Sequence, residues 1–434
     1  MVSPAQFQSQ YKEVLTRCRL NDVPDRSQLR TLIEHTRNEL FIFFGGGYEP
    51  FATLKKILEC QESLLAPIRS LPPELIHEIF SFVTAADRIS YKVGSRRKKI
   101  LGPVYPLTWV CHWWRRQALS RSTLWSSIDL GIVSPKANLD VVKFFHDCIL
   151  RTGGTACIPM DVCIDLTEYG RESSGHSFVG PHLQLLSLLI CQANKWRSLV
   201  FKGPSEDLFG RFNGIVTTLL NTRTIFFPLL EKLTLSLDGP EWTTRSPLRP
   251  LGTIFDSCPR LHTLETSSLW FGGTIDLRNL KVLRVGSYSG PSLSTLFCAC
   301  PLLQSLQITM FDYESRSAPE SCYTHTNLSK LHINHLPGDY FAPDAWNSVK
   351  LPKLAELIVT AHFMSSVWEL DDFKEMLVRS ECKLWRVNFF GSRRVPSDVV
   401  ESFFKDLPVD KESSILYVDN QRFDLWQEEQ NRKE

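Results

Sequence analysis

The chain has 434 residues, of which 43% are hydrophobic and 22% are charged. This is the composition of a folded protein, and the length predicts two or three structural units. Its 49 basic and 47 acidic side chains leave a net charge of +2, so no global field favours nucleic acid or a membrane surface as a partner. The longest apolar stretch, residues 183–193, is too short to cross a bilayer. We therefore expect no membrane partner and no nucleic acid partner.

The N-terminal ten residues have neither the basic nor the apolar segment of a secretion signal. This predicts a protein of the cytoplasm, the nucleus or both. The twelve cysteines are scattered and form no C-x-x-C pair, so buried thiols are expected rather than disulfides. Cys298 and Cys300 form a C-x-C, but no second Cys/His pair lies at zinc-ligand spacing. We expect neither a metal nor a cofactor.

Residues 1–66 are predicted to be helical. Pro24 begins a run with apolar residues at helical spacing, and Gly45-Gly46-Gly47 interrupts it. The three glycines could form a phosphate-binding loop, but they lack the Lys-Ser/Thr that follows in such loops, which favours a flexible link between helices. A second helical run has one apolar face: Leu54, Ile57, Leu58, Leu64 and Leu65. Nothing earlier in the chain is expected to cover this face, so it should pack on the next segment or self-associate.

The next segment contains two helical runs that carry much apolar surface. The first starts at Pro72 and Pro73, which suit a first helical turn, and extends to Val83. The second covers residues 107–119 and leads into Leu124-Trp125. Two short helices cannot cover this much aliphatic and aromatic surface between them. They must pack on the rest of the chain, on a partner, or on both.

These runs resemble the F-box motif. The sequences LPPELIHEIFSFV, LTWVCHWWRRQAL and LWSSI are similar to its Leu-Pro-x-Glu start, its Ile/Phe helix, its Val-Cys-x-x-Trp-Arg segment and its closing Leu-Trp. With SLLAPIRSLPPE before them, they resemble the large F-box families of mushroom-forming fungi. The resemblance covers residues 65–128. One departure is that residues 85–106 are expected to form a longer, basic loop than the F-box usually has.

The resemblance implies a non-catalytic substrate receptor of an SCF-type (Skp–cullin–F-box) E3 ubiquitin ligase. The F-box would bind the Skp-type adaptor of a cullin–RING ligase, and the rest of the chain would hold a target protein. By carry-over onto matching positions, the adaptor contacts are Leu71, Pro72, Ile79, Phe80, Val110, Cys111, Trp114 and Arg115. About half of them are expected to pack the helices together instead. The alternatives are a scaffold that uses the F-box outside a ligase, and a divergent hydrolase.

Within the predicted loop, residues 95–99 (Ser-Arg-Arg-Lys-Lys) form a short basic run. Such a run could serve nuclear import or nucleic-acid binding. Because no aromatic residues are interleaved with it, a solvated loop is favoured.

A phrase of the form L-x-x-L-x-L recurs through the second half of the chain. Its central residues are Leu233, Leu264, Leu283, Leu306, Leu331, Leu357 and Val387, with weaker copies around Ile128 and Leu199. From Leu199 onward the steps between central residues are 34, 31, 19, 23, 25, 26 and 30, and the later steps straddle the period of leucine-rich repeats. Each phrase predicts a strand with its first, fourth and sixth positions buried, followed by a helical stretch. An isolated phrase would be an ordinary buried strand, but seven in order favour an α/β solenoid.

The predicted fold is therefore a leucine-rich-repeat-like α/β solenoid, preceded by N-terminal helices and a small all-α F-box. The expected divisions are an N-terminal helical segment (1–66), the F-box (67–131), the repeat-like domain (132–410) and a charged C-terminal tail (411–434). Residues that alternate with the core positions should form one concave recognition face: Thr234, Glu265, Arg284, Gln307, His332 and Asn388. This mixture of charge, amide and imidazole suits an unknown target protein better than a uniform polyanion.

No arrangement of residues predicts an enzyme. Residues 286–290 (Gly-Ser-Tyr-Ser-Gly) have the outline of a nucleophile elbow, but Tyr288 stands where the serine must be. His325, His332 and His335 are close in sequence, yet His332 alternates with core residues and should face the open side of a strand. Neither a metalloprotease, a dinucleotide-binding nor a Walker motif occurs.

Overall fold

The computed structural model describes residues 4–431 with internal gaps. The gaps are residues 23–24, 43–47, 85–87, 94–98, 133–138, 153–157, 168–179, 204–226, 238–254, 256–257, 271–274, 291, 313–321, 336–345, 362–370, 392–396, 406 and 410–413. The chain divides into two compact units. The first comprises residues 1–92, 96–129 and 143–158, and the second comprises 93–95, 130–142 and 159–434. Within the described ranges, no helix combines the length and the hydropathy that crossing a membrane requires.

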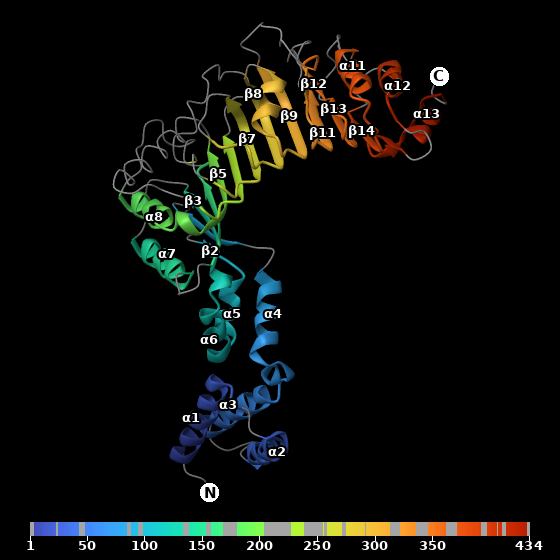
Figure 1. The fold of residues 1–434 in the computed structure, drawn as a ribbon. Coiled ribbons are helices and arrows are strands. Elements are labelled where there is room, and N and C mark those ends of the chain that lie inside the picture. Colours follow the sequence, from blue (N-terminus) through green and yellow to red (C-terminus); the bar gives the residue numbers. More distant parts are fainter. Residues whose placement is uncertain are drawn as a thin grey trace. The chain divides into compact units, whose positions relative to one another are not determined.

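The first unit begins with three helices that share a core. They are α1 (Pro4–Leu20), α2 (Arg26–Ile42) and α3 (Tyr48–Leu64), as Figure 1 shows. Asp25 caps α2, because its Oδ1 accepts the backbone N–H of Ser27 at 2.8 Å. The buried side chains of the core come from all three helices: Val14, Cys18, Leu29, Ile33, Leu54, Ile57 and Leu64. The expectation that nothing earlier in the chain covers the apolar face of α3 is therefore wrong, since α1 and α2 cover it. The triple glycine lies outside the described residues.

The F-box-resembling segment follows as short helices and one hairpin. Its elements are η1 (Pro67–Ser70), α4 (Pro73–Thr84), β1 (Ile89–Val93), β2 (Lys99–Leu101), α5 (Val104–Val110), α6 (His112–Ser120) and η2 (Ser122–Trp125). The strand β3 (Ser127–Ile132) and the helix α7 (Leu139–Thr152) come next. The predicted loop at 85–106 instead contains the antiparallel pair β1–β2. Of the basic run, residues 95–98 lie outside the described ranges.

The helix predicted over residues 107–119 is interrupted at Cys111. This residue is extended (φ −160°, ψ 170°), which ends α5 and starts α6. Its Sγ accepts the backbone N–H of Trp114 at 3.4 Å and so acts as the N-cap of α6. The axes of α5 and α6 can therefore differ in direction, which one continuous helix would not allow.

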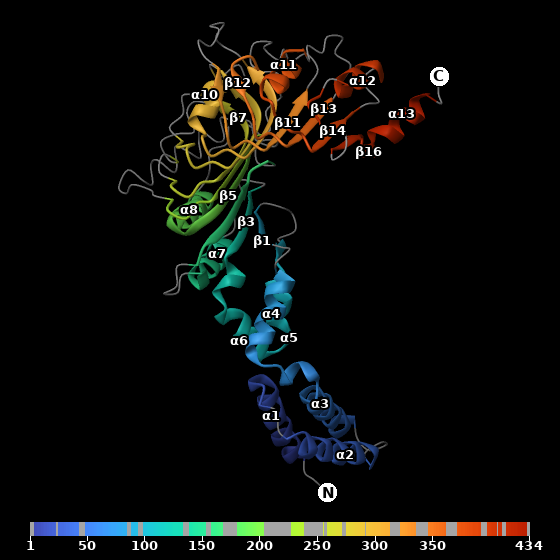
Figure 2. The same ribbon diagram turned by 45° about the vertical axis from the view of Figure 1, so that its right-hand side comes forward.

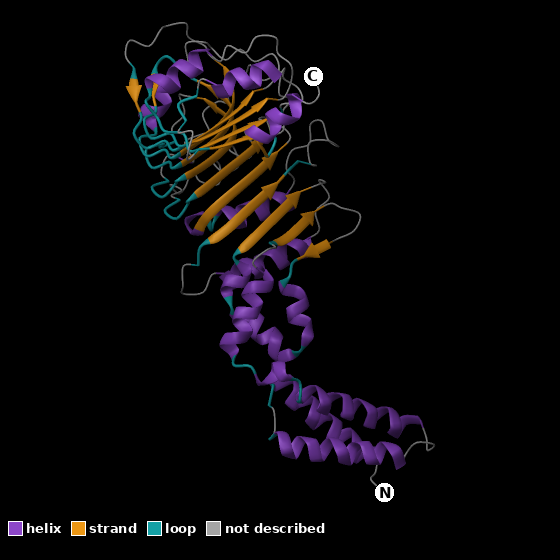
Figure 3. Ribbon diagram, turned by 90° about the vertical axis from the view of Figure 1, so that its right-hand side faces the viewer, coloured by secondary structure: helices purple, strands orange, loops and turns teal. Residues whose placement is uncertain are grey.

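The second unit is built on a mostly parallel sheet. Its strands are β4 (Met160–Asp165), β5 (Trp196–Gly203), β6 (Lys232–Leu237), β7 (Thr263–Trp270), β8 (Val282–Ser289), β9 (Ser305–Asp312), β11 (Lys330–His335), β13 (Glu356–Ala361), β14 (Arg386–Phe390) and β15 (Ile415–Val418). They lie in chain order, and the antiparallel β16 (Gln421–Arg422) ends the series. Figure 3 shows the strands side by side. A separate parallel pair joins β10 (Tyr323–Thr324) and β12 (Val349–Lys350).

Helices and 3₁₀ turns lie between these strands. They are α8 (Gly180–Ile190), η3 (Ala193–Lys195), α10 (Leu293–Ala299), α11 (Asp371–Arg379), α12 (Ser397–Lys405) and α13 (Phe423–Asn431). Figure 2 shows α10, α11 and α12 on the same side of the sheet. Phe403 of α12 packs on Phe389 of β14 with ring centroids 5.7 Å apart, so this is the side to which the core positions point. The opposite side of these strands is the open face.

The recurrent phrases occupy these strands in register. Their central residues are Cα partners from strand to strand and are buried: Leu199, Leu233, Leu264, Leu283, Leu306, Leu331, Leu357 and Val387. The parallel sheet does not stop at the predicted boundary at residue 410. β15 pairs with β14, so the segment expected to be a tail supplies further strands and α13.

Candidate functional site

The helices α4 and α6 and the turn η2 surround a compact core. Phe80 and Trp114 meet edge to face with ring centroids 5.1 Å apart, and both side chains are buried. Trp125 is buried as well, and its Nε1 donates to the carbonyl of Ala118 at 2.9 Å. Leu71 packs partly buried against the same core. Cys111 does the same, so four of the eight predicted adaptor contacts, Leu71, Phe80, Cys111 and Trp114, contribute to packing in this structure.

The other predicted contacts lie nearer the surface. Pro72, Ile79 and Val110 are exposed. Arg115 is exposed too, but its Nε donates to the carbonyl of Thr108 at 3.1 Å and so joins α6 to α5. Cys111, which is half-buried, also caps α6. The structure thus separates the predicted set into core, cap and surface.

A set of exposed apolar side chains lies on α4 and α5, and motif matching missed most of it. On α4 it consists of Leu75, Ile79, Phe82 and Val83, which recur at helical spacing on one side of the helix. On α5 it consists of Trp109 and Val110. Phe82 is 85% exposed and Trp109 is 73% exposed. We call these six residues the apolar strip. The helical spacing of Leu75, Ile79 and Phe82 was the sequence signal that could have identified it.

The six predicted recognition residues lie in one row on the open face. The strand register pairs Thr234 with Glu265, then Arg284, then Gln307, then His332. From His332 the row continues through Ile358 of β13 to Asn388 of β14, and it ends at Tyr417 of β15. We call this the central row. The sequence analysis omitted Ile358 and Tyr417, which occupy it as well.

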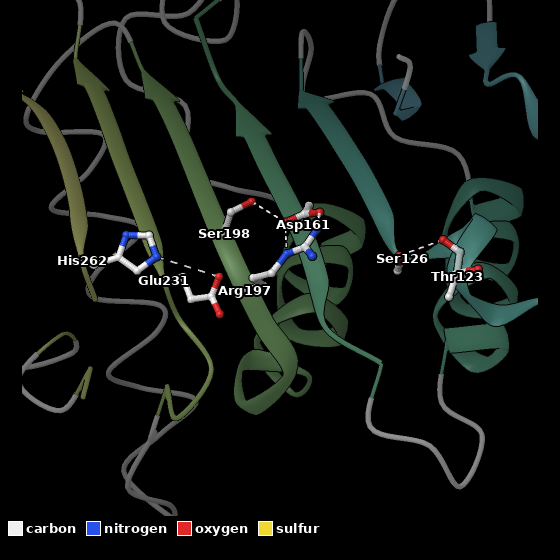
Figure 4. A network of polar contacts seen from close by, with 7 residues as sticks. All are labelled: Thr123, Ser126, Asp161, Arg197, Ser198, Glu231 and His262. Carbon is white, nitrogen blue, oxygen red and sulfur yellow. Dashed lines mark hydrogen bonds and ion pairs between the residues drawn. The ribbon is translucent and has the colours of Figure 1, made fainter. Parts of the chain in front are cut away.

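Several charged side chains in and beside the central row are paired between neighbouring strands. Arg284 lies 3.6 Å from Glu265, and Lys330 lies 2.8 Å from Glu356. The guanidinium of Arg197 donates hydrogen bonds from two nitrogens to the Asp161 carboxylate. This hydrogen bonding raises the pKa of Arg197. Figure 4 shows this contact, with Ser198 donating to Asp161 at 2.7 Å and His262 approaching Glu231. Such exposed pairs add little stability.

Two polar side chains of the central row are buried. Thr234 is 9% exposed and Asn388 is 6% exposed. Neither Thr234 Oγ1 nor Asn388 Oδ1 has a hydrogen-bond partner in the part of the chain that the structure describes. By contrast, His332 Nε2 lies 3.0 Å from Thr360 Oγ1.

The residues considered for catalysis have structural contacts. Tyr288 is buried, and its hydroxyl donates to the carbonyl of Ser292 at 3.1 Å. His325 is buried, whereas His332 lies on the open face as predicted. Burial raises the pKa of the Cys300 thiol to about 12, so this thiol stays protonated. Over the described residues, no three His, Cys, Asp or Glu side chains come together as a metal site.

Comparison with known families identifies the segment that carries the apolar strip. Residues 68–131 match the F-box-like family. The first unit therefore contains an F-box-like domain, and the apolar strip lies within it. No curated protein matches the chain.

Proposed function

We propose that this protein is the substrate-recognition subunit of an SCF-type E3 ubiquitin ligase. The observation that carries the proposal is the apolar strip of an F-box-like domain. Its six side chains stay exposed although the same helices bury a core of their own. F-box domains generally bind Skp-type adaptors. A strip of Leu, Ile, Phe, Val and Trp side chains left in water is the surface such an adaptor would bury.

In this proposal the chain acts by proximity and performs no catalysis. The F-box-like domain binds the adaptor of a cullin–RING ligase, and the second unit holds the target. The ligase-associated enzyme then transfers ubiquitin to a substrate kept at high effective concentration. The cytoplasm and the nucleus are the proposed places of action.

The second unit would serve as a divergent leucine-rich-repeat domain of solenoid type. Two features support this. Its parallel strands keep one register, with helices on the core side. The same turn contact also recurs: Asn279 Nδ2 donates to the carbonyl of Pro259 at 3.1 Å, and Asn327 Nδ2 donates to that of Pro301 at 2.8 Å. Each contact joins one phrase to the preceding one, as expected of stacked repeats. The open face would then bind the target.

The adaptor proposal is tested by substitutions that leave the core intact. We expect the double variant Phe82→Ala/Trp109→Ala to lose co-purification with a co-expressed Skp-type adaptor, because it removes the two most exposed aromatic rings of the strip. Phe41→Ala is a matched control, since Phe41 is also a phenylalanine of the first unit, 83% exposed, but lies outside the F-box-like domain. All three substitutions should change stability by no more than about 0.5 kcal/mol. Full adaptor binding by the double variant would refute this docking surface.

Trp114 and Phe80 are unsuitable for that test. Both are core residues, and truncating a buried aromatic side chain costs about 3–5 kcal/mol. Loss of binding in Trp114→Ala would therefore report unfolding as readily as a lost contact. The same co-purification distinguishes the receptor from the scaffold alternative, because a receptor brings the cullin with the adaptor and a non-ligase scaffold brings the adaptor alone.

A further inference from the structure

The open face of the second unit changes character toward its C-terminal end. On the middle strands Glu265 and Arg284 form an ion pair. Over β13 to β15, apart from Thr360 and from Glu356, which Lys330 binds, the outward side chains are mainly aliphatic and aromatic, with one arginine and one buried amide. These residues are Ile358, Trp385, Arg386, Asn388, Ile415 and Tyr417, and we call them the terminal patch.

Register places most of the terminal patch together. Ile358, Asn388 and Tyr417 are successive members of the central row. Arg386 and Ile415 are Cα partners two residues earlier on the same strands, and residues two apart on a strand share a face. The patch therefore spans three neighbouring strands on one side of the sheet.

Trp385 adjoins this group just before β14. The backbone N–H of Ile415 donates to the Trp385 carbonyl at 2.8 Å. Trp385 is the second residue of its phrase, as Arg197 is in the phrase of β5, and each stands immediately before the first outward residue. The Arg197 side chain reaches Asp161 on the neighbouring strand, as Figure 4 shows. Trp385 is 44% exposed and Ile415 is 39% exposed, unusually high for large apolar side chains. Tryptophan and arginine are the residue types that contribute most to binding at protein interfaces.

Arg386 is a cation without a carboxylate partner among the described residues. Glu356, its register partner on β13, is bound by Lys330 at 2.8 Å. Arg386 instead places its guanidinium over the Tyr417 ring, 5.9 Å from the centroid. It thus keeps its hydrogen-bond donors available for an anion, which a carboxylate can accept in a two-pronged geometry.

Asn388 is the buried polar residue of the patch. Its Oδ1 lacks a hydrogen-bond donor among the described residues, and burying an amide oxygen in that state is unfavourable. Because the folded chain itself covers this oxygen, a segment bound on the surface does not reach it. Asn388 therefore bears on the stability of the patch and not on its contacts with a ligand.

We propose that the terminal patch binds an acidic, apolar segment of the target polypeptide, with a carboxylate on Arg386 and an apolar side chain against Trp385 and Ile415. This inference rests on the proposed receptor function and adds the chemistry of the target. It assigns target selection to β13–β15 rather than to the paired charges of the middle strands.

A displayed library of random peptides, screened against the full chain in complex with its adaptor, tests the assignment. The selected peptides should share an acidic residue close to a large apolar residue. We expect Trp385→Ala and Arg386→Ala each to raise the Kd of these peptides about tenfold or more. Arg284→Ala is the matched control, because Arg284 is an exposed arginine of the same face outside the patch. Arg386→Glu should change the selected peptides from acidic to basic.

A further variant separates binding from folding. Asn388→Leu removes the buried unpartnered amide and leaves the exposed residues of the patch in place, so its Tm should rise or stay unchanged while the Kd of the peptides stays unchanged. A library with no acidic–apolar consensus, or peptides whose Kd responds to Arg284→Ala but not to Arg386→Ala, would overturn the assignment. Adaptor co-purification of the same samples tells the two proposals apart, because all patch variants should retain the adaptor.

Discussion

At the scale of single residues, His325 is held in one neutral form by the fold. Its Nε2–H donates to the Cys300 carbonyl at 3.0 Å, and its Nδ1 accepts the Leu328 N–H at 3.1 Å. The ring also lies 5.0 Å from that of Phe297. Burial lowers the pKa of His325, against a smaller raising effect of the hydrogen bond to Cys300. Protonation of Nδ1 would place two donors, Nδ1–H and the Leu328 N–H, against each other.

This arrangement predicts acid sensitivity of the second unit. Because the pKa of His325 is lower in the folded chain than in the unfolded chain, unfolding takes up a proton at acidic pH. Its stabilising contribution is complete above about pH 6.5, the ordinary histidine pKa, and declines as the pH falls below it. We expect His325→Gln to destabilise the chain by about 1–3 kcal/mol at pH 7.5 and to flatten the fall of Tm between pH 7 and pH 5.

Equal pH slopes for the natural chain and His325→Gln would contradict the assignment.

At the scale of elements, α1 connects the N-terminal helices to the F-box-like domain. Arg69 of η1 donates to the Cys18 carbonyl at 2.9 Å, and the Asn21 amide donates to the Arg69 carbonyl at 3.0 Å. His112 of α6 lies 3.1 Å from the Arg19 carbonyl. The end of α1 therefore contacts both η1 and α6, while the body of α1 packs on α3.

The effect of N-terminal truncation follows from this packing. Deleting residues 1–50 removes α1 and α2 but leaves the apolar face of α3 in water. Each large side chain uncovered costs about 1.5–3 kcal/mol, so this variant should aggregate. Deleting residues 1–66 removes the whole three-helix group and should give a more soluble chain with faster hydrogen exchange over residues 75–83. Size-exclusion chromatography and hydrogen exchange measure both effects. A monomeric chain after the shorter deletion would contradict the role of α1 and α2 as a cover.

At the scale of the whole molecule, the C-terminal residues close the parallel sheet. β15 pairs with β14, and the β15–β16 hairpin turns through Asp419 and Asn420, which both have positive φ. From α13, the ring of Phe423 stacks on Phe404 of α12 at 4.4 Å. A parallel sheet needs such a terminal element, because an open strand edge can pair with other chains.

Removing residues 411–434 should therefore expose the edge of β14 and the ring of Phe404. We expect this variant to form oligomers or aggregates at concentrations at which a chain ending at Asn431 stays monomeric. Light scattering coupled to size-exclusion chromatography compares the two. An unchanged monomer with an unchanged Tm would show that β14 tolerates an open edge.

The periodic parts of this protein were predictable from its sequence. The L-x-x-L-x-L phrases have a strand period of two, and burying each Leu row forces the same register on every strand. That is why the residues alternating with Leu233 through Val387 lie in one row on one face. The F-box-like segment was equally predictable, because its helices carry a dense motif over residues that match the family.

Tertiary structure decided which residues of each pattern remain available. Phe80 and Phe82 are two residues apart in the same apolar run, yet one is buried by Trp114 and the other is 85% exposed. The apolar face of α3 is covered by α1 and α2, and the sequence of α3 alone does not reveal this. Arg284 and Arg386 are both exposed arginines of this sheet, in neighbouring rows of the register, but among the described residues only Arg284 has a carboxylate partner. Local sequence determines the period of an element, whereas burial and charge pairing depend on neighbours that lie far away along the chain and come close only in the folded state.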